Sequence, residues 1–146
     1  MQANDNLKNH QPIEVVALAL QRTADGRFLL ARRGPSEKGA GEWEFPGGKI
    51  EKNEFGLTET QTYALKREIK EELNIEIDVI NKLSNSVFDY GTFKINLIPF
   101  IANYISGEIR LTEHKDYRIL NKSELSFLDW AQADIPIVEE FLKLEL

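Results

Sequence analysis

The sequence predicts a mixed α/β domain in which helices cover a central sheet on both faces. Apolar, β-branched or aromatic segments stand on both sides of a long amphipathic helical segment, and a second helical segment lies near the C-terminus. The length of 146 residues suits one domain. A domain of this size buries enough surface to fold without a disulfide or a structural metal.

The segments before the helix contain three strand candidates. Residues 13–20 (IEVVALAL) form an apolar, β-branched run, which is typical of a strand buried on both faces. The turn residues Ala24-Asp25-Gly26 lead into residues 27–33, so this pair predicts a hairpin. Trp43–Phe45 is a short aromatic candidate, and Pro46-Gly47-Gly48 breaks the chain directly after it.

The central helix is expected over residues 58–73. Thr58 suits the N-cap, because Gln61 follows three residues later in a capping-box pattern. Apolar residues repeat every four positions and predict one buried stripe: Leu65, Ile69 and Leu73. Asn74 suits a left-handed C-cap.

The remainder of the chain predicts further strands and a terminal helix. Strands are expected over residues 75–80, 86–89, 92–104 and 117–120. A tight turn at Ser106-Gly107-Glu108 predicts that residues 108–111 pair back on the preceding strand. Residues 133–144 are the helix candidate, with Pro136 in the first turn.

Composition excludes several kinds of site. Cysteine is absent, so disulfides, zinc ribbons, iron–sulfur clusters and thiol nucleophiles are excluded. There are only two histidines, which argues against a metal site built from several imidazoles. The net charge of −6 argues against holding nucleic acid by bulk charge, although a bound cation can invert the local field.

The N-terminal segment has no targeting signal. Residues 1–12 are polar and lack the apolar core of a signal peptide, so we expect a flexible N-terminus before one domain over residues 13–146. No apolar run approaches the ~20 residues of a membrane helix. We therefore expect a cytoplasmic protein with no membrane partner, and the oligomeric state stays open.

The segment Arg67–Glu72 (REIKEE) carries a candidate metal site. Glu68, Glu71 and Glu72 share one edge of the helix at spacings of three and four residues. Like charges at these spacings destabilise a helix unless a cation lies between them. Carboxylate oxygens suit Mg²⁺ or Mn²⁺. The alternative is a solvated helix face on which neighbouring lysines pair with the acids. The double glycine Gly47-Gly48, which lets backbone approach a ligand closely, favours the metal site.

These two motifs together resemble the Nudix box, G-x5-E-x7-R-E-U-x-E-E-x-G-U, in which U is aliphatic. The matching segments are WEFPGGKIE and ALKREIKEEL, in that order. The positions that match the box are Gly48, Arg67, Glu68, Ile69, Glu71, Glu72 and Ile75. The resemblance implies a Nudix α/β/α sandwich and a pyrophosphohydrolase that depends on a divalent metal.

The sequence departs from the box at two places. Ten residues separate Gly48 from Glu59 where the box has five, so the loop carries an insertion of five. Glu54 keeps the spacing from the glycine and Glu59 keeps the spacing to Arg67. We favour Glu59 because the helix sets its geometry relative to Arg67, whereas a loop can absorb extra residues. Asn74 replaces the last glycine and tolerates positive φ.

The resemblance also implies roles for individual residues. Glu68, Glu71 and Glu72 bind the metal, and Arg67 orients these carboxylates. The backbone carbonyl of Gly48 or Lys49 is a further candidate ligand. Glu113, in the loop after the sheet, is expected to bind a metal or to accept a proton from the attacking water. The cofactor is then Mg²⁺, with Mn²⁺ as an alternative, and water attacks a phosphorus of the substrate.

The C-terminal segment Leu128–Val138 resembles the MutT branch, the 8-oxo-dGTP pyrophosphohydrolases. Asp134 matches a position that reads the purine edge, and it is equally a candidate helix N-cap. Arg33 matches a position near the substrate, and Phe45 is a candidate base contact. Ile119 stands where that branch often has tryptophan. The expected substrate is a purine nucleoside triphosphate such as dGTP or 8-oxo-dGTP, cleaved to the monophosphate and pyrophosphate.

Two alternatives stay open. The first is removal of pyrophosphate from the 5′ end of triphosphorylated RNA, for which Lys38, Arg32 and Arg33 lie near the expected site. The second is a Nudix-like nucleotide-binding module without catalysis. Retention of Glu68, Glu71 and Glu72 argues against that second alternative.

Overall fold

The computed structural model describes residues 11–23, 26, 28–33, 41–110 and 114–144. Within them, the strands of one mixed sheet are β1 Ile13–Arg22, β2 Phe28–Arg33, β3 Trp43–Glu44, β4 Gly47–Lys49, β5 Glu76–Lys82, β6 Ser86–Asp89, β7 Lys94–Ser106 and β8 His114–Leu120. The helices are α2 Gln61–Leu73, the 3-10 helices η1 Lys122–Phe127 and η2 Gln132–Asp134, and α3 Ile135–Lys143.

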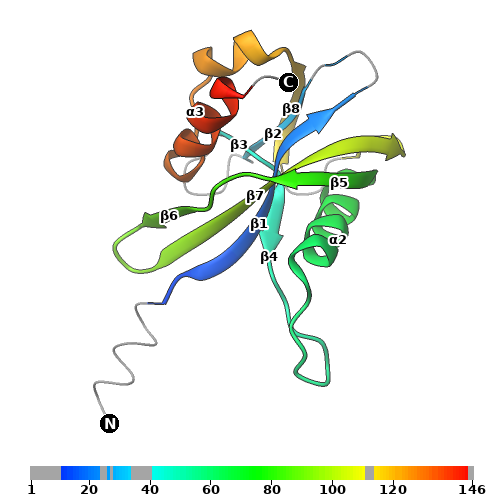
Figure 1. The fold of residues 1–146 in the computed structure, drawn as a ribbon, viewed down its shortest axis with the longest axis vertical. Coiled ribbons are helices and arrows are strands. Elements are labelled where there is room, and N and C mark those ends of the chain that lie inside the picture. The colour runs from blue at the N-terminus through cyan, green and yellow to red at the C-terminus, as the bar shows by residue number, and fades with distance from the viewer. Residues whose placement is uncertain (1–10, 24–25, 27, 34–40, 111–113, 145–146) are drawn as a thin grey trace.

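The centre of the sheet is the parallel pair β1 and β7. The strand order is β3-β2-β1-β7-β5, and the other strands pair in antiparallel fashion, β4 with β1, β6 with β7 and β8 with β2 (Figure 1). The predicted hairpin of β1 and β2 is confirmed, since Arg22 lies opposite Phe28. The predicted mixed sheet is therefore confirmed.

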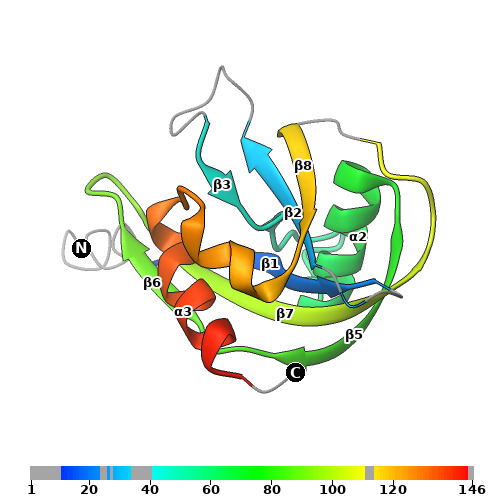
Figure 2. The ribbon, with the colours of Figure 1, turned by 90° about the horizontal axis from the view of Figure 1, so that it is seen from above.

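Strand β1 is buried on both faces, as its apolar run predicts. Val16 and Leu18 belong to the core beneath α2, whereas Ala17 and Ala19 belong to the core beneath α3. Figure 2 shows α2 and α3 on opposite sides of the sheet. The alternation of β1 side chains thus supplies both cores, which explains why this strand shows no alternation of apolar and polar residues.

Helix α2 packs on the sheet through the predicted stripe, which is fully buried: Leu65, Ile69 and Leu73. The N-cap is Thr60, whose side chain accepts a hydrogen bond from the Tyr63 amide at 3.2 Å. The prediction of Thr58 as the N-cap is wrong. Thr58 instead forms an antiparallel bridge with Lys52, so its backbone is extended two residues before the cap.

The C-terminal end of α2 explains a second difference. Asn74 takes the predicted left-handed conformation with φ of 61°. The predicted pairing of residues 108–111 on the preceding strand is wrong for residues 108–110, and residue 111 lies outside the described residues. Arg110 N donates to Leu73 O at 2.9 Å, and Asn74 Nδ2 donates to Glu108 O at 3.1 Å. This segment therefore caps the helix, while β1 and β5 occupy both edges of β7.

Other elements differ modestly from expectation. Strand β4 was not predicted, because its glycines have low β-propensity and pair with β1 through backbone alone. The terminal helix α3 begins at Ile135 rather than residue 133, because η2 precedes it, and Pro136 lies in the first turn as predicted.

Residues 1–10 lie outside the described part. Across the part that is described, no helix has the length and apolar character to cross a membrane.

Gly107 provides a test of the packing between β7 and α2. A Cβ on Gly107 would lie 2.5 Å from Asn74 O, and its φ is +110°. Gly107→Ala should lower the free energy of unfolding by at least about 2 kcal/mol, measured by urea denaturation. Gly91→Ala is the matched control, because Gly91 has φ of +93° with nothing within 4 Å, and it should cost only about 1 kcal/mol. Equal losses for the two variants would contradict this packing.

Candidate active site

Strand β4 approaches α2 closely because its first two residues lack side chains. A Cβ on Gly47 would lie 1.9 Å from Val16 O, so glycine is required where β4 pairs with β1. A Cβ on Gly48 would lie 2.3 Å from Glu68 Oε2, so the Glu68 carboxylate occupies that space. Gly47 N also donates to Glu72 Oε2 at 2.9 Å. The double glycine therefore brings two carboxylates of α2 against the backbone of β4.

Arg67 and Glu59 form a bidentate ion pair beside these carboxylates. Arg67 Nε lies 2.6 Å from Glu59 Oε2, and Arg67 Nη2 lies 2.8 Å from Glu59 Oε1. Glu54 lies in the exposed turn of the preceding loop. The structure thus places Glu59 against Arg67, as preferred from the sequence, although Glu59 lies before the Thr60 N-cap and therefore outside the helix, and the loop absorbs the insertion.

The other edge of the Arg67 guanidinium contacts the carboxylates of α2. Arg67 Nη1 lies 3.0 Å from Glu68 Oε1 and 3.1 Å from Glu71 Oε2. Arg67 Nη2 also donates to Lys49 O at 3.2 Å. One guanidinium therefore connects the loop, β4 and the acidic edge of α2. Of the two carbonyls suggested as metal ligands, that of Lys49 accepts a hydrogen bond from Arg67.

This arrangement shifts the pKa values of the charged groups in different directions. Hydrogen bonding to Arg67 holds the pKa of Glu59 below its ordinary value, and hydrogen bonding to Glu59 raises the pKa of Arg67. Burial raises the pKa of Glu68, although the Arg67 guanidinium opposes that effect. Glu72 is only 4% exposed. Two carboxylates are thus withdrawn from water, where a cation would stabilise their charged form.

The donor set fits a hard divalent cation. Glu68, Glu71 and Glu72 supply oxygen from one helix edge, and Gly48 leaves room for a carboxylate next to the backbone. Within the described residues, no three acidic or imidazole side chains are arranged as a ready-made ligand cluster. Arg67 and Gly47 N hold the three carboxylates in their present positions, so binding a cation requires these side chains to reorient.

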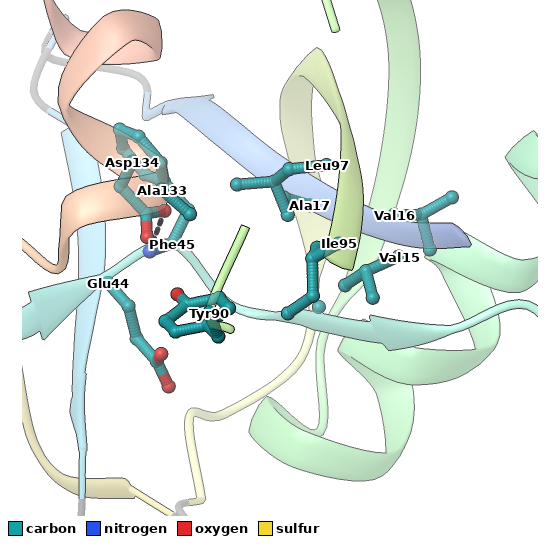
Figure 3. Close-up of a pocket in the computed structure, with 11 residues that line it drawn as sticks. Val15, Val16, Ala17, Glu44, Phe45, Tyr90, Ile95, Leu97, Ala133 and Asp134 are labelled. Carbon is teal, nitrogen blue, oxygen red and sulfur yellow. Dashed lines mark hydrogen bonds between the residues drawn. The ribbon is translucent and has the colours of Figure 1, made fainter. Parts of the chain in front are cut away.

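A cavity of about 100 Å³ opens on the opposite face of the sheet (Figure 3). It is lined by Val15, Val16, Ala17, Glu44, Phe45, Gly47, Tyr90, Ile95, Leu97, Ala133 and Asp134. The Phe45 ring packs against Trp130 with ring centroids 4.7 Å apart. Asp134 Oδ1 accepts a hydrogen bond from Phe45 N at 3.3 Å, and this carboxylate makes no N-cap hydrogen bond. Asp134 is the N-cap residue of α3, as one of the two interpretations predicted, but its side chain does not form the capping hydrogen bond.

Comparison with known proteins agrees with this arrangement. The NUDIX domain family model matches residues 12–141. The chain belongs to the Nudix family. It is 36% identical over 132 residues to the CTP pyrophosphohydrolase of Escherichia coli K12, covering 90% of this chain and 93% of that protein. It is 36% identical over 87 residues to the 8-oxo-dGTP diphosphatase of Proteus vulgaris, covering 60% of this chain and 71% of that protein.

The Nudix fold is also shared with solved structures. The crystal structure of the MutT protein from Methanosarcina mazei Go1 superimposes with a TM-score of 0.77 at 26% identity, covering 90% of this chain and 94% of the other. The predicted family and sandwich fold are confirmed, and the protein is a Nudix hydrolase of the MutT type.

Several residues proposed for the Nudix site are not placed by the structure. Lys38 and Glu113 lie outside the described residues. Arg33 is in β2 opposite His114 of β8, and its side chain is not described. The sequence analysis also missed Glu44 and Tyr90, which line the cavity. Glu44 stands within the quoted WEFPGG motif, whereas no sequence pattern singles out Tyr90 in the turn between β6 and β7.

The Arg67–Glu59 pair predicts a pH dependence of stability. The folded state holds Glu59 ionised below its ordinary pKa of 4.5, so the stabilising contribution is present above about pH 4.5 and is lost as the pH falls through the folded pKa. Glu59→Gln should be less stable than the wild type at neutral pH, and the difference should shrink in acid. Urea unfolding at a series of pH values measures this effect.

Glu54→Gln is the matched control for this measurement, because Glu54 lies in the exposed turn of the same loop. It should follow the wild-type pH dependence. A parallel pH profile for Glu59→Gln and the wild type would contradict the assigned role of the ion pair.

Proposed function

We propose that this Nudix hydrolase is a Mg²⁺-dependent pyrophosphohydrolase that cleaves a nucleoside triphosphate to the monophosphate and pyrophosphate. The observation that carries the proposal is the acidic edge of α2. Arg67 contacts Glu68 and Glu71 there, and Gly47 N of β4 contacts Glu72, so that three negative side chains lie along one helix edge. Such concentrated charge costs stability unless a cation or a cationic side chain compensates it.

Three helix residues would hold the metal, namely Glu68, Glu71 and Glu72, with Gly48 O and Glu113 as further ligands. When bound, Mg²⁺ or Mn²⁺ neutralises charge on the phosphate oxygens and lowers the pKa of a bound water. Arg67 orients Glu68 and Glu71 through its hydrogen bonds, and Gly47 N orients Glu72. Glu113 is the candidate acceptor for the proton of the attacking water.

The cavity on the other face of the sheet would bind the nucleobase. Phe45 offers an aromatic wall, and Glu44 and Asp134 offer carboxylate oxygens. Carboxylates accept hydrogen bonds, so they favour bases that present N–H donors. Guanine presents N1–H and N2–H₂ on one edge, which supports dGTP or 8-oxo-dGTP as the substrate. Arg33 and Lys38 are the candidate phosphate contacts.

A second candidate substrate is CTP. It is favoured by the likeness to the CTP pyrophosphohydrolase, which extends over 90% of this chain. Cytosine presents the N4–H₂ donor, so a cavity lined by Glu44 and Asp134 is compatible with it as well. Uracil presents oxygen at that position, where a carboxylate would oppose binding. Comparing the hydrolysis rates of CTP and UTP therefore tests recognition of the hydrogen-bonding edge of the base, because the two nucleotides differ only there.

A substrate panel with Mg²⁺ tests the proposal. The panel contains 8-oxo-dGTP, dGTP, GTP, CTP, UTP, ADP-ribose and a 5′-triphosphate RNA, with release of pyrophosphate as the readout. We expect 8-oxo-dGTP or CTP to have the highest kcat/KM and UTP to be at least about tenfold poorer than CTP. Asp134→Asn should reduce that discrimination, because an amide both donates and accepts.

Other outcomes of the panel have definite meanings. A strong preference for the RNA would replace the nucleotide assignment with RNA 5′ pyrophosphohydrolysis. Hydrolysis of none of the compounds, with nucleotide still bound, would instead indicate a binding module.

The metal site predicts a large effect of one isosteric change. Glu72→Gln should lower kcat by at least about a hundredfold while preserving the fold, since it removes a ligand charge and keeps the acceptor for Gly47 N. Glu76→Gln is the control, because Glu76 is exposed and pairs with Lys70. EDTA should abolish turnover of the wild type. Full activity of Glu72→Gln would refute the metal-site assignment.

A further inference from the structure

The segment between β4 and α2, which carries the insertion, folds as a closed hairpin rather than an open loop. Lys52 and Thr58 form an antiparallel bridge, and Asn53 N donates to Leu57 O at 2.8 Å. The next pair after Lys52 and Thr58, away from the tip, is Glu51 and Glu59, in which Glu59 N donates to Glu51 O at 2.9 Å. These contacts continue as a two-stranded ladder toward the helix.

The tip of this hairpin is organised by the Asn53 side chain. Asn53 Oδ1 accepts hydrogen bonds from Phe55 N at 2.9 Å and from Leu57 N at 3.0 Å. Gly56 completes the turn with φ of +80°, and Gly56 N donates to Asn53 O at 3.0 Å. One amide side chain therefore satisfies two backbone donors that the turn leaves without backbone partners.

Burial of apolar surface contributes little to the shape of the hairpin. Phe55 is 79% exposed and Leu57 is 66% exposed. Among the described residues, neither Phe55 nor Leu57 belongs to a hydrophobic core cluster or packs against one. Its register must then depend mainly on hydrogen bonds, among which those of Asn53 are the side-chain bonds nearest to the tip.

The base of the hairpin is joined directly to the Arg67–Glu59 pair. Glu51 N donates to Glu59 Oε1 at 2.9 Å, and the same oxygen accepts from Arg67 Nη2 at 2.8 Å. The Glu51 carboxylate is itself 3.8 Å from Arg67. The pairing of Glu51 with Glu59 thus orients the Glu59 carboxylate toward Arg67. Arg67 in turn donates hydrogen bonds to Glu68 and Glu71.

We propose that Asn53 is a positioning residue for the hydrolytic reaction. By closing the inserted hairpin in one register, Asn53 returns Glu59 to Arg67 across five additional residues. It thereby keeps Arg67 on the acidic edge of α2. The inference rests on the proposed catalytic role of that edge. A longer loop without this turn would sample more conformations, and Glu59 would meet Arg67 for a smaller fraction of the time.

The first test is steady-state kinetics of Asn53→Ala on the preferred nucleotide with Mg²⁺. We expect kcat to fall by about tenfold and KM to change less than about twofold. Displacement of a catalytic group by ~1 Å costs on the order of a hundredfold, and the hairpin is partly retained by its backbone bonds. Asn53→Asp, which keeps an acceptor oxygen, should restore kcat to within about twofold of the wild type.

Asn81→Ala is the matched control variant. Asn81 Oδ1 also accepts a backbone hydrogen bond, from Lys82 N at 2.8 Å, and it is exposed on the edge strand β5. This variant should keep the wild-type kcat. Gly56→Ala disturbs the same turn through its positive φ and should resemble Asn53→Ala, whereas Gly56→Asn tolerates that φ and should be milder.

The second test does not require activity. The Nε–H signal of Arg67 in a ¹⁵N–¹H NMR spectrum reports its hydrogen bond with Glu59. In Asn53→Ala we expect this signal to move toward the position of a solvated guanidinium and to exchange faster with water, with core amide signals unchanged. In Asn53→Asp and Asn81→Ala it should remain as in the wild type.

These outcomes separate the inference from the proposed function. If no panel compound is hydrolysed but the Arg67 signal responds as expected, the proposed function fails, and what stands is that Asn53 holds Glu59 against Arg67. If nucleotide is hydrolysed, and Asn53→Ala and Gly56→Ala both retain wild-type kcat and an unchanged Arg67 signal, the inference is overturned.

Discussion

The ion pair between Arg67 and Glu59 is the contact on which the rest of the acidic site depends. Its two short bonds, of 2.6 and 2.8 Å, bind the end of the inserted hairpin to the second turn of α2. The remaining donors of the same guanidinium reach Lys49 O, Glu68 and Glu71. Planar guanidinium geometry allows all these bonds at once, which a lysine ammonium cannot do. One side chain therefore sets the relative positions of three segments.

The segment that crosses from β3 to β4 joins the two chemically distinct parts of the molecule. Glu44 and Phe45 line the cavity next to η2, and Gly48 meets Glu68 of α2. Gly47 belongs to both parts, since it lines the cavity and its N–H donates to Glu72. Under the proposed function, this segment is the connection between the nucleobase cavity and the acidic edge of α2.

Part of the net negative charge of the chain is concentrated at one site in this arrangement. The net charge of −6 includes Glu68, Glu71 and Glu72, which are gathered on one helix edge, and Glu113 is proposed to join them. Two divalent ions would make four such carboxylates close to neutral, so that a polyphosphate can approach. Overall charge is thus a poor guide to the substrate here, because the cation that changes its sign is not encoded in the composition.

Local periodicity in the sequence was enough to determine α2, its buried stripe, the left-handed Asn74 and the shared edge of three carboxylates. Each depends on residues within one or two turns of each other. The preference for Glu59 over Glu54 followed from its sequence spacing to Arg67, although Glu59 reaches Arg67 from the hairpin before α2 and not from the helix itself. Tertiary structure alone decided that Thr60 rather than Thr58 caps the helix, since Thr58 is held by Lys52. It also decided that Asp134 accepts from Phe45 N, 89 residues away, and that Tyr90 joins the cavity. The last two contacts join segments far apart in the chain, whereas the bridge between Lys52 and Thr58 closes a local hairpin; neither kind of pairing leaves a periodic trace in the sequence.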